Sequence, residues 1–306
     1  MADYTSTQLL ADAREYAMLP TYDEGASARM LRRFNTEQLT YLTKQLQKVR
    51  EDYRTATLDI TLVASRLTYP IPTRAIAAGL QMLQVVDSAG TSWGLWELRP
   101  RDWPAGGTWV SPCRRFYLQG NFITFYAAPP TGTLRVSYPL RLSELVLPTD
   151  TANVRTISTI NTGTKVLTLS GTFTNAAGLC DLVRATPHFD ILGMDSSFTG
   201  TGTSTLTFAA TLPTGLAVGD YVCIPGKSPV CQAPLELHSL LAQHVAYVTL
   251  QAKGDPKAAT LEKLRDDTAS SVLTLLAPRP ERPRSIQNYS APGWHRWAGG
   301  VYRGGQ

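Results

Sequence analysis

Thiols and imidazoles are the side chains best suited to bind a metal ion or to act as nucleophiles. The four cysteines lie far apart in the sequence and form no C-x-x-C pair: Cys113, Cys180, Cys223 and Cys231. His238 and His244 are six residues apart, so they do not share one helix face as the histidines of an H-x-x-x-H metal site do. The spacing predicts neither a zinc site nor a redox motif, and we expect no metal and no cofactor.

Carboxylates offer a second kind of chemistry, because two acids held close together can share general acid and base roles. Asp181 and Asp220 occupy matching positions in two related stretches of sequence, and an unrecognised hydrolase would use them in this way. The simpler interpretation is that they mark equivalent turns. The chain has no phosphate-binding glycine loop, no G-x-S-x-G elbow and no H-E-x-x-H motif. We therefore predict no catalytic residues and no enzyme activity.

Aromatic and basic side chains are concentrated in two segments suited to binding a partner. The first, residues 92–109, holds four of the six tryptophans, interleaved with arginines. Such rings could stack on bases or on a glycan. Alternatively, they pack the loop onto a sheet or lie at a subunit interface, where tryptophan is enriched. The candidate interface residues of this loop are Trp93, Trp96, Arg99, Arg101, Trp103 and Trp109.

The second segment is the C-terminal stretch 277–306, which is interrupted by prolines and has five arginines against one acid, Glu281. It cannot continue a helix and has no pattern that would bury a core of its own. Its tryptophans favour an extended arm that docks on another protein. A basic arm on DNA phosphates and an unstructured end are the alternatives. The residues of the predicted arm are Arg279, Arg282, Arg284, Tyr289, Trp294, Arg296, Trp297, Tyr302 and Arg303.

The N-terminal part of the chain has the periodicity of amphipathic helices. Thr5 can cap a helix through Ala17, and a second helix is expected from about Glu24. Asn35 and Gln38 match a capping box, which suggests that the helix restarts there. Apolar residues at helical spacing then predict about four further turns that pack on one partner. The stripe consists of Leu39, Leu42, Leu46, Val49 and Tyr53.

Helical periodicity returns after Pro229. A broad apolar face predicts one helix, and Asp255-Pro256 is a suitable N-cap and first-turn pair for a last helix to about Leu276. Because Lys253-Gly254 joins the two helices, we expect them to form an antiparallel hairpin.

Between the helices the pattern changes to alternating β-branched and aromatic residues. Strands are expected at 57–62 and 83–86. Residues 115–127 have the pattern of a hairpin with Gly120-Asn121 as its tight turn. Residues 134–138 predict a further strand that can pair with this hairpin.

An internal repeat occurs in residues 153–225, a stretch rich in Thr and Gly. Thr162–Thr168 matches Thr201–Thr207, and the Asp181-Leu-Val triplet matches Asp220-Tyr-Val at the same offset. Two copies of a strand, turn and strand unit would together close a small barrel or sandwich, because neither copy can bury its apolar face alone.

These elements predict an α+β fold: a helical bundle built from N- and C-terminal helices, antiparallel β regions, an inserted small β-barrel or sandwich, and an extended C-terminal arm. The expected division assigns 1–56 and 230–276 to the helical bundle and 57–150 to the antiparallel β region with its Trp-rich loop. It assigns 151–229 to the inserted repeat-containing β-domain and 277–306 to the arm.

Length and composition limit the class of protein further. With 306 residues, the chain can bury one large or two modest cores. It has no secretory signal and no apolar run long enough to span a membrane. We therefore expect that the protein is synthesised in the cytoplasm and makes no membrane contact. The formal net charge of +5 is carried mostly by the C-terminal stretch, so the body is nearly neutral.

Four stretches of the sequence together resemble the head-to-tail adaptor, or connector, proteins of tailed bacteriophages, above all the short-tailed type. They are Phe34–Tyr41, Leu67–Ala75, Arg101–Pro104, and Leu275–Pro280 with the basic aromatic tail that follows it. The resemblance covers the helical ends and the first β region. The repeat in 153–225 looks like an added domain.

This resemblance implies a virion protein at the head-tail interface. Such adaptors form a ring, usually a dodecamer, beneath the portal protein and join it to the tail nozzle and tail fibres. Their helices form part of the DNA ejection channel, and their C-terminal arms insert between portal subunits. Carried over here, the portal-binding arm is Arg279–Gln306; non-specific contact with channel DNA stays open. The alternative function is a carbohydrate-binding or fibre-docking virion tail protein that uses the Trp-rich loop.

Overall fold

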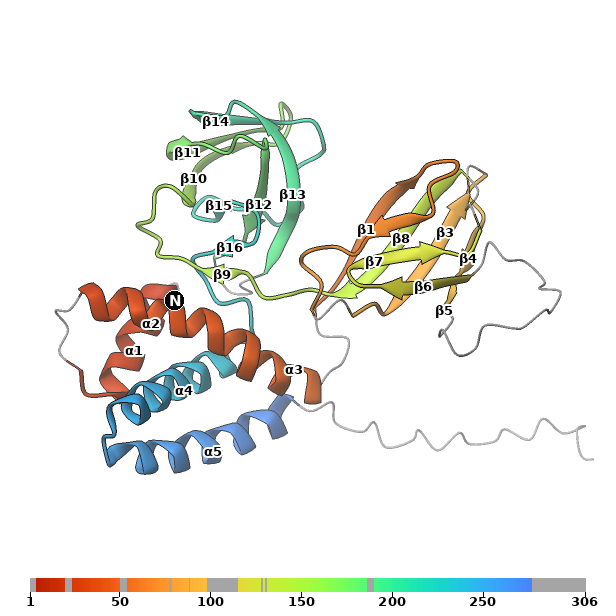
Figure 1. Ribbon diagram of the computed structural model, residues 1–306. Coiled ribbons are helices and arrows are strands. Elements are labelled where there is room, and N and C mark those ends of the chain that lie inside the picture. Colours follow the sequence, from red (N-terminus) through yellow and green to blue (C-terminus); the bar gives the residue numbers. More distant parts are fainter. Residues whose placement is uncertain are drawn as a thin grey trace, which may run out of the picture.

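The computed structural model describes residues 4–19, 24–49, 54–76, 79–87, 89–97, 115–127, 129, 131–185 and 190–276. The protein is an α+β structure in which helices from both ends of the chain lie together. Two separate β regions lie on the same side of these helices (Figure 1). The predicted C-terminal arm, residues 277–306, lies outside the described residues.

The helices come from the two ends of the sequence. The N-terminal helices are α1 (Ser6–Tyr16), α2 (Glu24–Glu37), the π-helical turn η1 (Gln38–Leu42) and α3 (Thr43–Val49). The C-terminal helices are α4 (Glu236–Lys253) and α5 (Lys257–Leu276). None of the described helices is both long and apolar enough to cross a membrane.

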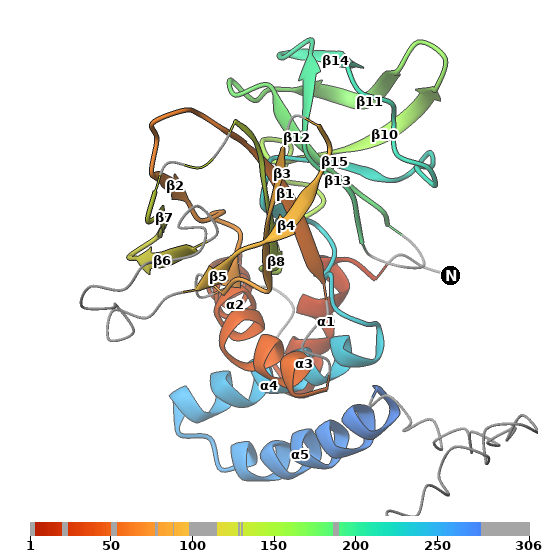
Figure 2. The same cartoon turned by 90° about the vertical axis from the view of Figure 1, so that its right-hand side faces the viewer.

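Local signals set the ends of several helices as predicted. The backbone N–H of Thr5 donates to the Gln8 side chain at 2.8 Å and so caps α1. Gly254, with φ +70°, ends α4 in the left-handed conformation that favours glycine. The Asp255 carboxylate accepts from the Lys257 N–H at 2.9 Å, which opens α5. Helices α4 and α5 therefore form the predicted antiparallel hairpin (Figures 1 and 2).

One apolar core joins the N- and C-terminal helices. It contains Leu9 of α1, Phe34 of α2, Leu42 of η1, and Leu241 and Val245 of α4, all of which are fully buried. Each such side chain contributes about 1.5–3 kcal/mol when removed from water. Because these residues are distant in sequence, burial of this core holds the two ends of the chain together.

The predicted helix restart at Asn35 is wrong. The chain stays helical from Glu24 to Val49, and one π-helical turn follows Glu37 instead of a cap. A π turn adds a residue to the helical repeat, which rotates the apolar stripe. Accordingly Leu39 is 39% exposed, whereas Leu42 and Leu46 are buried. Tyr53 of the predicted stripe lies outside the described residues.

The first β region is a sandwich of two four-stranded sheets. One sheet has the order β1-β8-β3-β4 and the other β2-β7-β6-β5. Their strands are β1 (Thr55–Leu62), β2 (Thr68–Pro70), β3 (Met82–Asp87), β4 (Ser92–Gly94), β5 (Trp96–Glu97), β6 (Arg115–Gln119), β7 (Phe122–Phe125) and β8 (Gly132–Pro139). Side chains from both sheets form its core, including Val85 and Val136 from one and Ile123 and Phe125 from the other.

The predicted hairpin is confirmed: β6 and β7 pair around Gly120-Asn121, and Gly120 has φ +57°. The predicted partner of residues 134–138 is wrong. Strand β8 pairs with β1 and β3, not with the hairpin. Leu134 and Val136 share one core with the hairpin residues of the other sheet. These apolar side chains therefore pack between the two sheets and do not belong to neighbouring strands of one sheet. The expectation of purely antiparallel pairing fails at β5 and β6, which are parallel.

The second β region is a closed six-stranded barrel of order β10-β11-β14-β13-β12-β15. Its strands are β10 (Val154–Asn161), β11 (Val166–Phe173), β12 (Leu179–Val183), β13 (Ile191–Thr199), β14 (Thr203–Phe208) and β15 (Tyr221–Cys223). Closure from the two repeats was predicted. Each repeat, however, supplies three strands, so that β10, β11 and β12 correspond to β13, β14 and β15. Two short parallel strands, β9 (Glu144–Leu145) and β16 (Lys227–Ser228), lie where the chain enters and leaves the barrel.

Candidate functional site

Most residues of the predicted interface loop and arm lie outside the described residues. Trp93 belongs to β4 and Trp96 to β5, so two of the four tryptophans are strand residues of the sandwich. The remaining loop residues are Arg99, Arg101, Trp103 and Trp109, and they fall in 98–114, which the structure does not describe. The same holds for every predicted arm residue, from Arg279 to Arg303.

The strand that leads into the Trp-rich loop borders a group of aromatic side chains. In the parallel pair of β5 and β6, Trp96 lies opposite Arg115, two residues before Tyr117. The Tyr117 ring meets the Tyr126 ring edge to face, with 5.8 Å between centroids. Phe122 of β7 is 46% exposed and Tyr126 is 37% exposed. The sandwich therefore presents aromatic surface beside this loop.

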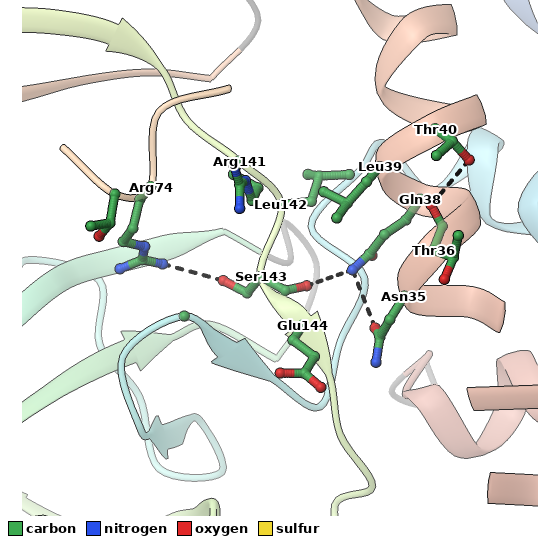
Figure 3. A pocket seen from close by; sticks show the side chains of 12 residues that line it. Asn35, Thr36, Gln38, Leu39, Thr40, Arg74, Arg141, Leu142, Ser143 and Glu144 are labelled. Carbon is green, nitrogen blue, oxygen red and sulfur yellow. Dashed lines mark hydrogen bonds between the residues drawn. The ribbon is translucent and has the colours of Figure 1, made fainter. Parts of the chain in front are cut away.

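A cleft of about 520 Å³ lies where the helices and both β regions meet (Figure 3). The segment between β8 and β9 crosses it, flanked by helix α2 with η1 and by the chain after β2. The lining side chains that matter most are Asn35, Gln38, Arg74, Arg141, Ser143 and Glu144. We refer to this cleft and its hydrogen-bonded surroundings as the junction.

Two amide side chains attach the helices to the junction. Asn35 donates from Nδ2 to the Leu145 carbonyl at 3.0 Å and accepts from the Leu145 N–H at 2.6 Å. Gln38 donates from Nε2 to the Ser143 carbonyl at 2.8 Å and to Asn35 Oδ1 at 3.3 Å. The two residues that match a capping box therefore hydrogen-bond a distant strand segment instead of a helix end.

The π turn accounts for the local geometry of Gln38. Its backbone carbonyl accepts from the Thr43 hydroxyl at 2.7 Å, and both residues are buried. The same carbonyl accepts the Thr43 backbone N–H, which is the five-residue bond of a π turn, so the hydroxyl is a second donor to it. Such turns frequently occur at functional sites, and this one lies directly beside the cleft.

One ion pair attaches the sandwich to the barrel. Arg74 follows β2, and its guanidinium binds Asp181 of β12 through two contacts: Nη1 to Oδ1 at 3.0 Å and Nη2 to Oδ2 at 2.9 Å. The Asp181 carboxylate is fully buried and also accepts from the N–H groups of Asp195 and Gly226, each at 2.9 Å. Arg74 further donates to the Ser143 hydroxyl at 3.3 Å. A buried, bidentate pair of this kind has little freedom to adopt another geometry.

A second carboxylate lies close to this ion pair. Asp195 lies 3.7 Å from Arg74 Nη1, and its backbone φ is +49°. Burial raises the pKa of Asp195 above its usual value, and the neighbouring Asp181 charge raises it further, against the opposing effect of Arg74. The single guanidinium therefore faces two carboxylates, and the charged form of Asp195 is disfavoured.

The aspartates of the repeat have different roles. The interpretation of both as turn markers is wrong for Asp181, which lies inside strand β12. It is confirmed for Asp220, which precedes β15 and accepts from the N–H groups of Ala217 at 2.7 Å and Ala185 at 3.0 Å.

The described thiols are chemically inert. Cys180, Cys223 and Cys231 are buried and form no disulfide, and Cys113 lies outside the described residues. Burial raises the pKa of Cys231 to about 11 and raises that of the other two thiols as well. Since the thiolate is the reactive form, these groups do not act as nucleophiles at neutral pH.

The two histidines of α4 are packing residues. His238 donates from Nε2 to the carbonyls of Cys231 and Ala233, both at 3.1 Å, and burial lowers its pKa to about 4. His244 lies 3.0 Å from Glu37 and stacks on Tyr41, with 3.8 Å between centroids. No group of three or more His, Cys, Asp or Glu that could hold a metal occurs within the described part of the chain.

The junction was not predicted as a site. Sequence patterns give its residues separate interpretations: Asn35 and Gln38 as a helix cap, Asp181 as a position of the repeat, and Arg74 as part of the stretch Leu67–Ala75. A sequence signal was present in the Asn and Gln three residues apart, whose amides do share a hydrogen bond. Nothing in the sequence identifies Ser143, which contributes mainly through its backbone carbonyl.

A comparison with models of protein families finds a match. The family model described as SU10 adaptor protein matches residues 4–170, more than half of the chain. The matched stretch runs from the residues before α1 into β11, so it includes Asn35, Gln38, Arg74 and Ser143 but not Asp181. A search of curated proteins finds no match.

Proposed function

The chain belongs to the SU10 adaptor protein family, and on this premise we propose that it forms a ring beneath the portal of a short-tailed bacteriophage and joins that portal to the tail nozzle. Proteins of this family are structural phage proteins and not enzymes, so the chain is a virion component. The family match is the observation that carries the proposal.

The junction supports this function on physical grounds. A ring adaptor transmits load between the portal on one side and the tail on the other, so its parts must keep a fixed mutual orientation. Asn35 and Gln38 fix the helices to the segment that Arg74 and Asp181 tie to both β regions. Such a subunit would enter a ring with its shape already set, which lowers the entropic cost of assembly.

We assign portal binding to the arm Arg279–Gln306. Its arginines and aromatic rings are the residue types that dominate protein interfaces. Each single arm can bind weakly, because the arms of one ring, twelve in a dodecamer, engage together and gain affinity by multivalency. In the same proposal the helical bundle, 1–56 with 230–276, surrounds the channel, and the β regions 57–150 and 151–229 meet the nozzle and the fibres.

Deleting Arg284–Gln306 tests this assignment. The deletion removes most of the arm and leaves every described residue in place, so we expect a folded protein that no longer joins portal rings of the same phage. Negative-stain imaging of the mixture and co-elution on a sizing column would measure this.

A full-length chain carrying Trp294→Ala and Trp297→Ala should bind portal more weakly. Val218→Ala, at a side chain 65% exposed, is the matched control. Normal assembly of the deletion would refute the role of the arm.

A second candidate function is supported by the aromatic surface beside the Trp-rich loop. Exposed rings such as Phe122 of β7 and Tyr126 just after it lie on the sheet that also contains Trp96 of β5, and they are the type of surface that stacks on sugars or docks a fibre. Carbohydrate binding predicts sugar-dependent quenching of tryptophan fluorescence that Trp96→Ala or Trp103→Ala abolishes. Unchanged fluorescence across a panel of host surface glycans would exclude this function.

A further inference from the structure

A second cleft, of about 690 Å³, lies on the helical part of the protein, between α1, α4 and α5. Leu250 and Leu261 are buried and form its apolar floor. Its rim is also apolar but open to solvent, since Met18 is 70% exposed and Leu264 is 46% exposed. We call this cleft the helical groove.

The charged side chains of the helical groove give it an acidic wall. Asp12 and Glu15 line it from α1, next to the ring of Tyr16. Burial raises the pKa of Asp12 above its usual value, and the neighbouring Glu15 charge raises it further, so a cation docked beside this carboxylate would offset its desolvation. Tyr4 donates its hydroxyl to Asp12. Lys257 is the one cation among the described residues that line the groove, and its Nζ contacts Met18 Sδ at 3.2 Å.

A groove with an aromatic ring, apolar walls and two carboxylates is suited to a segment of prolines and arginines. Proline-rich peptides favour the extended polyproline II conformation, which docks in aromatic-lined grooves at a low entropic cost. The chain contains one such segment, Pro278–Arg284, which has three prolines, three arginines and a single acid. Its prolines fit the apolar walls, and its arginines complement Asp12 and Glu15.

Chain length decides which molecule supplies this segment. Leu264 is the groove residue nearest to the end of α5 at Leu276, and twelve helical residues separate them by about 18 Å. Pro280 follows Leu276 by four residues, which span at most about 14 Å when fully extended. The backbone of Pro278 and Pro280 therefore cannot lie along the groove of its own chain, although Pro283, seven residues beyond the helix, spans up to about 25 Å. A second copy can place the whole segment in the groove, so a contact that uses all three prolines is a contact between copies.

We propose that the helical groove binds Pro278–Arg284 of a second copy of this chain. This contact is a link between neighbouring copies in the ring of the proposed function, and it leaves the distal, aromatic part of the arm for the portal. It can be tested on the isolated full-length protein, without portal.

Self-association of the full-length chain gives the first test. Sedimentation velocity over a range of concentrations should show concentration-dependent assembly. Leu264→Asp places a charge in the groove, and a chain with both Pro280→Ala and Pro283→Ala loses the docking prolines. Each should weaken assembly roughly tenfold or more, because each removes an anchor of the contact. Leu275→Asp, on the same helix at a side chain 75% exposed and outside the groove, is the matched control and should assemble normally.

Mixing the two defective proteins gives the second test. The Leu264→Asp chain keeps an intact arm and the double proline variant keeps an intact groove, so the mixture should form one-to-one pairs that neither protein forms alone. A wild-type chain that stays monomeric, variants that assemble like wild type, or a mixture without pairs would each overturn the proposal. Circular dichroism confirms that the variants are folded.

The arm deletion separates this proposal from portal binding. A chain that lacks only Ser285–Gln306 keeps the whole segment Pro278–Arg284, so it should still self-associate while failing to join portal rings. Full-length protein that joins portal rings but does not self-associate would refute the groove contact and leave the proposed function standing. A deletion that self-associates and still joins portal rings would refute portal binding by the distal arm and leave the groove contact standing.

Discussion

The two halves of the barrel have equivalent strands but differ in what their matching aspartates do. Asp181 in the first half is fully buried and binds Arg74, which comes from the sandwich. Asp220 in the second half is also buried, but both of its hydrogen-bond donors, Ala185 and Ala217, belong to the barrel. Asp181 thus attaches the barrel to the sandwich, whereas Asp220 accepts hydrogen bonds only from within the barrel.

This difference shows how a repeated unit becomes part of a larger structure. The repeat preserves strand pairing, because closure of the barrel needs both copies. It does not preserve the environment of a buried charge, which depends on what the surrounding chain supplies. A buried carboxylate must be paired or fully hydrogen-bonded, and the two halves satisfy that requirement by different routes.

Asp181→Asn should have the largest effect. The substitution removes the charge that compensates the Arg74 guanidinium, whose side chain is only 14% exposed. Breaking one partner of a buried pair costs about 3–5 kcal/mol of unfolding free energy. Chemical denaturation would measure this. A cost no greater than that of the matching change at Asp220 would break the comparison between the two halves.

Asp220→Asn should cost less, about 1–2 kcal/mol. The asparagine keeps one acceptor oxygen for the two backbone donors, and no buried cation is left unpaired. Combining each variant with Arg74→Met sharpens the comparison: the effects should add for Asp220→Asn and should fall short of additive for Asp181→Asn. If the deviation from additivity with Arg74→Met were equal for the two aspartates, the assigned roles would be contradicted.

Asp195→Asn should stabilise the protein slightly at neutral pH. An acid whose pKa is raised by folding binds protons more tightly in the folded state, so its contribution to stability falls as the pH rises through its titration range. Asparagine removes this penalty and tolerates the positive φ of residue 195. Because the side chain is 43% exposed, solvent screening limits the gain to less than about 1 kcal/mol. The gain should vanish near pH 3, where the carboxyl is protonated.

Asp59→Asn should have the smallest effect. Asp59 and Arg135 form a bidentate pair across β1 and β8, and the hydrogen bond from Arg135 lowers the pKa of Asp59. Both side chains are more than 40% exposed, so the loss should be only about 0.2–1 kcal/mol. It should disappear in acid, since a lowered pKa contributes stability only while the carboxylate is charged. A cost close to that of Asp181→Asn would show that burial is not what separates the two pairs.

Sequence patterns predicted the elements that depend on neighbouring residues. The β6-β7 hairpin, the α4-α5 hairpin and the paired repeats of the barrel are all specified by short-range turn, cap and periodicity signals. The partners of β8 were not predictable in the same way, because alternation indicates a strand but not its neighbour.

The junction lies beyond such signals. Arg74 and Asp181 are separated by 107 residues, and Gln38 and Ser143 by 105. No local preference relates residues so far apart, and in a single sequence the Asn35 and Gln38 amides look like a helix cap. The sequence correctly indicates that the Asn35 and Gln38 amides bind backbone groups. Which backbone groups they bind depends on tertiary structure.

The parallel pairing of β9 with β16 has a consequence for the history of the molecule. The chain leaves for the barrel and comes back to an adjacent strand, with Glu144 beside Lys227. A domain whose two ends are neighbours can be excised, replaced or enlarged by a short splice without displacing the scaffold that carries it. The barrel can thus vary in sequence and size while the helices and the sandwich keep their structure, provided that an acid is kept for Arg74.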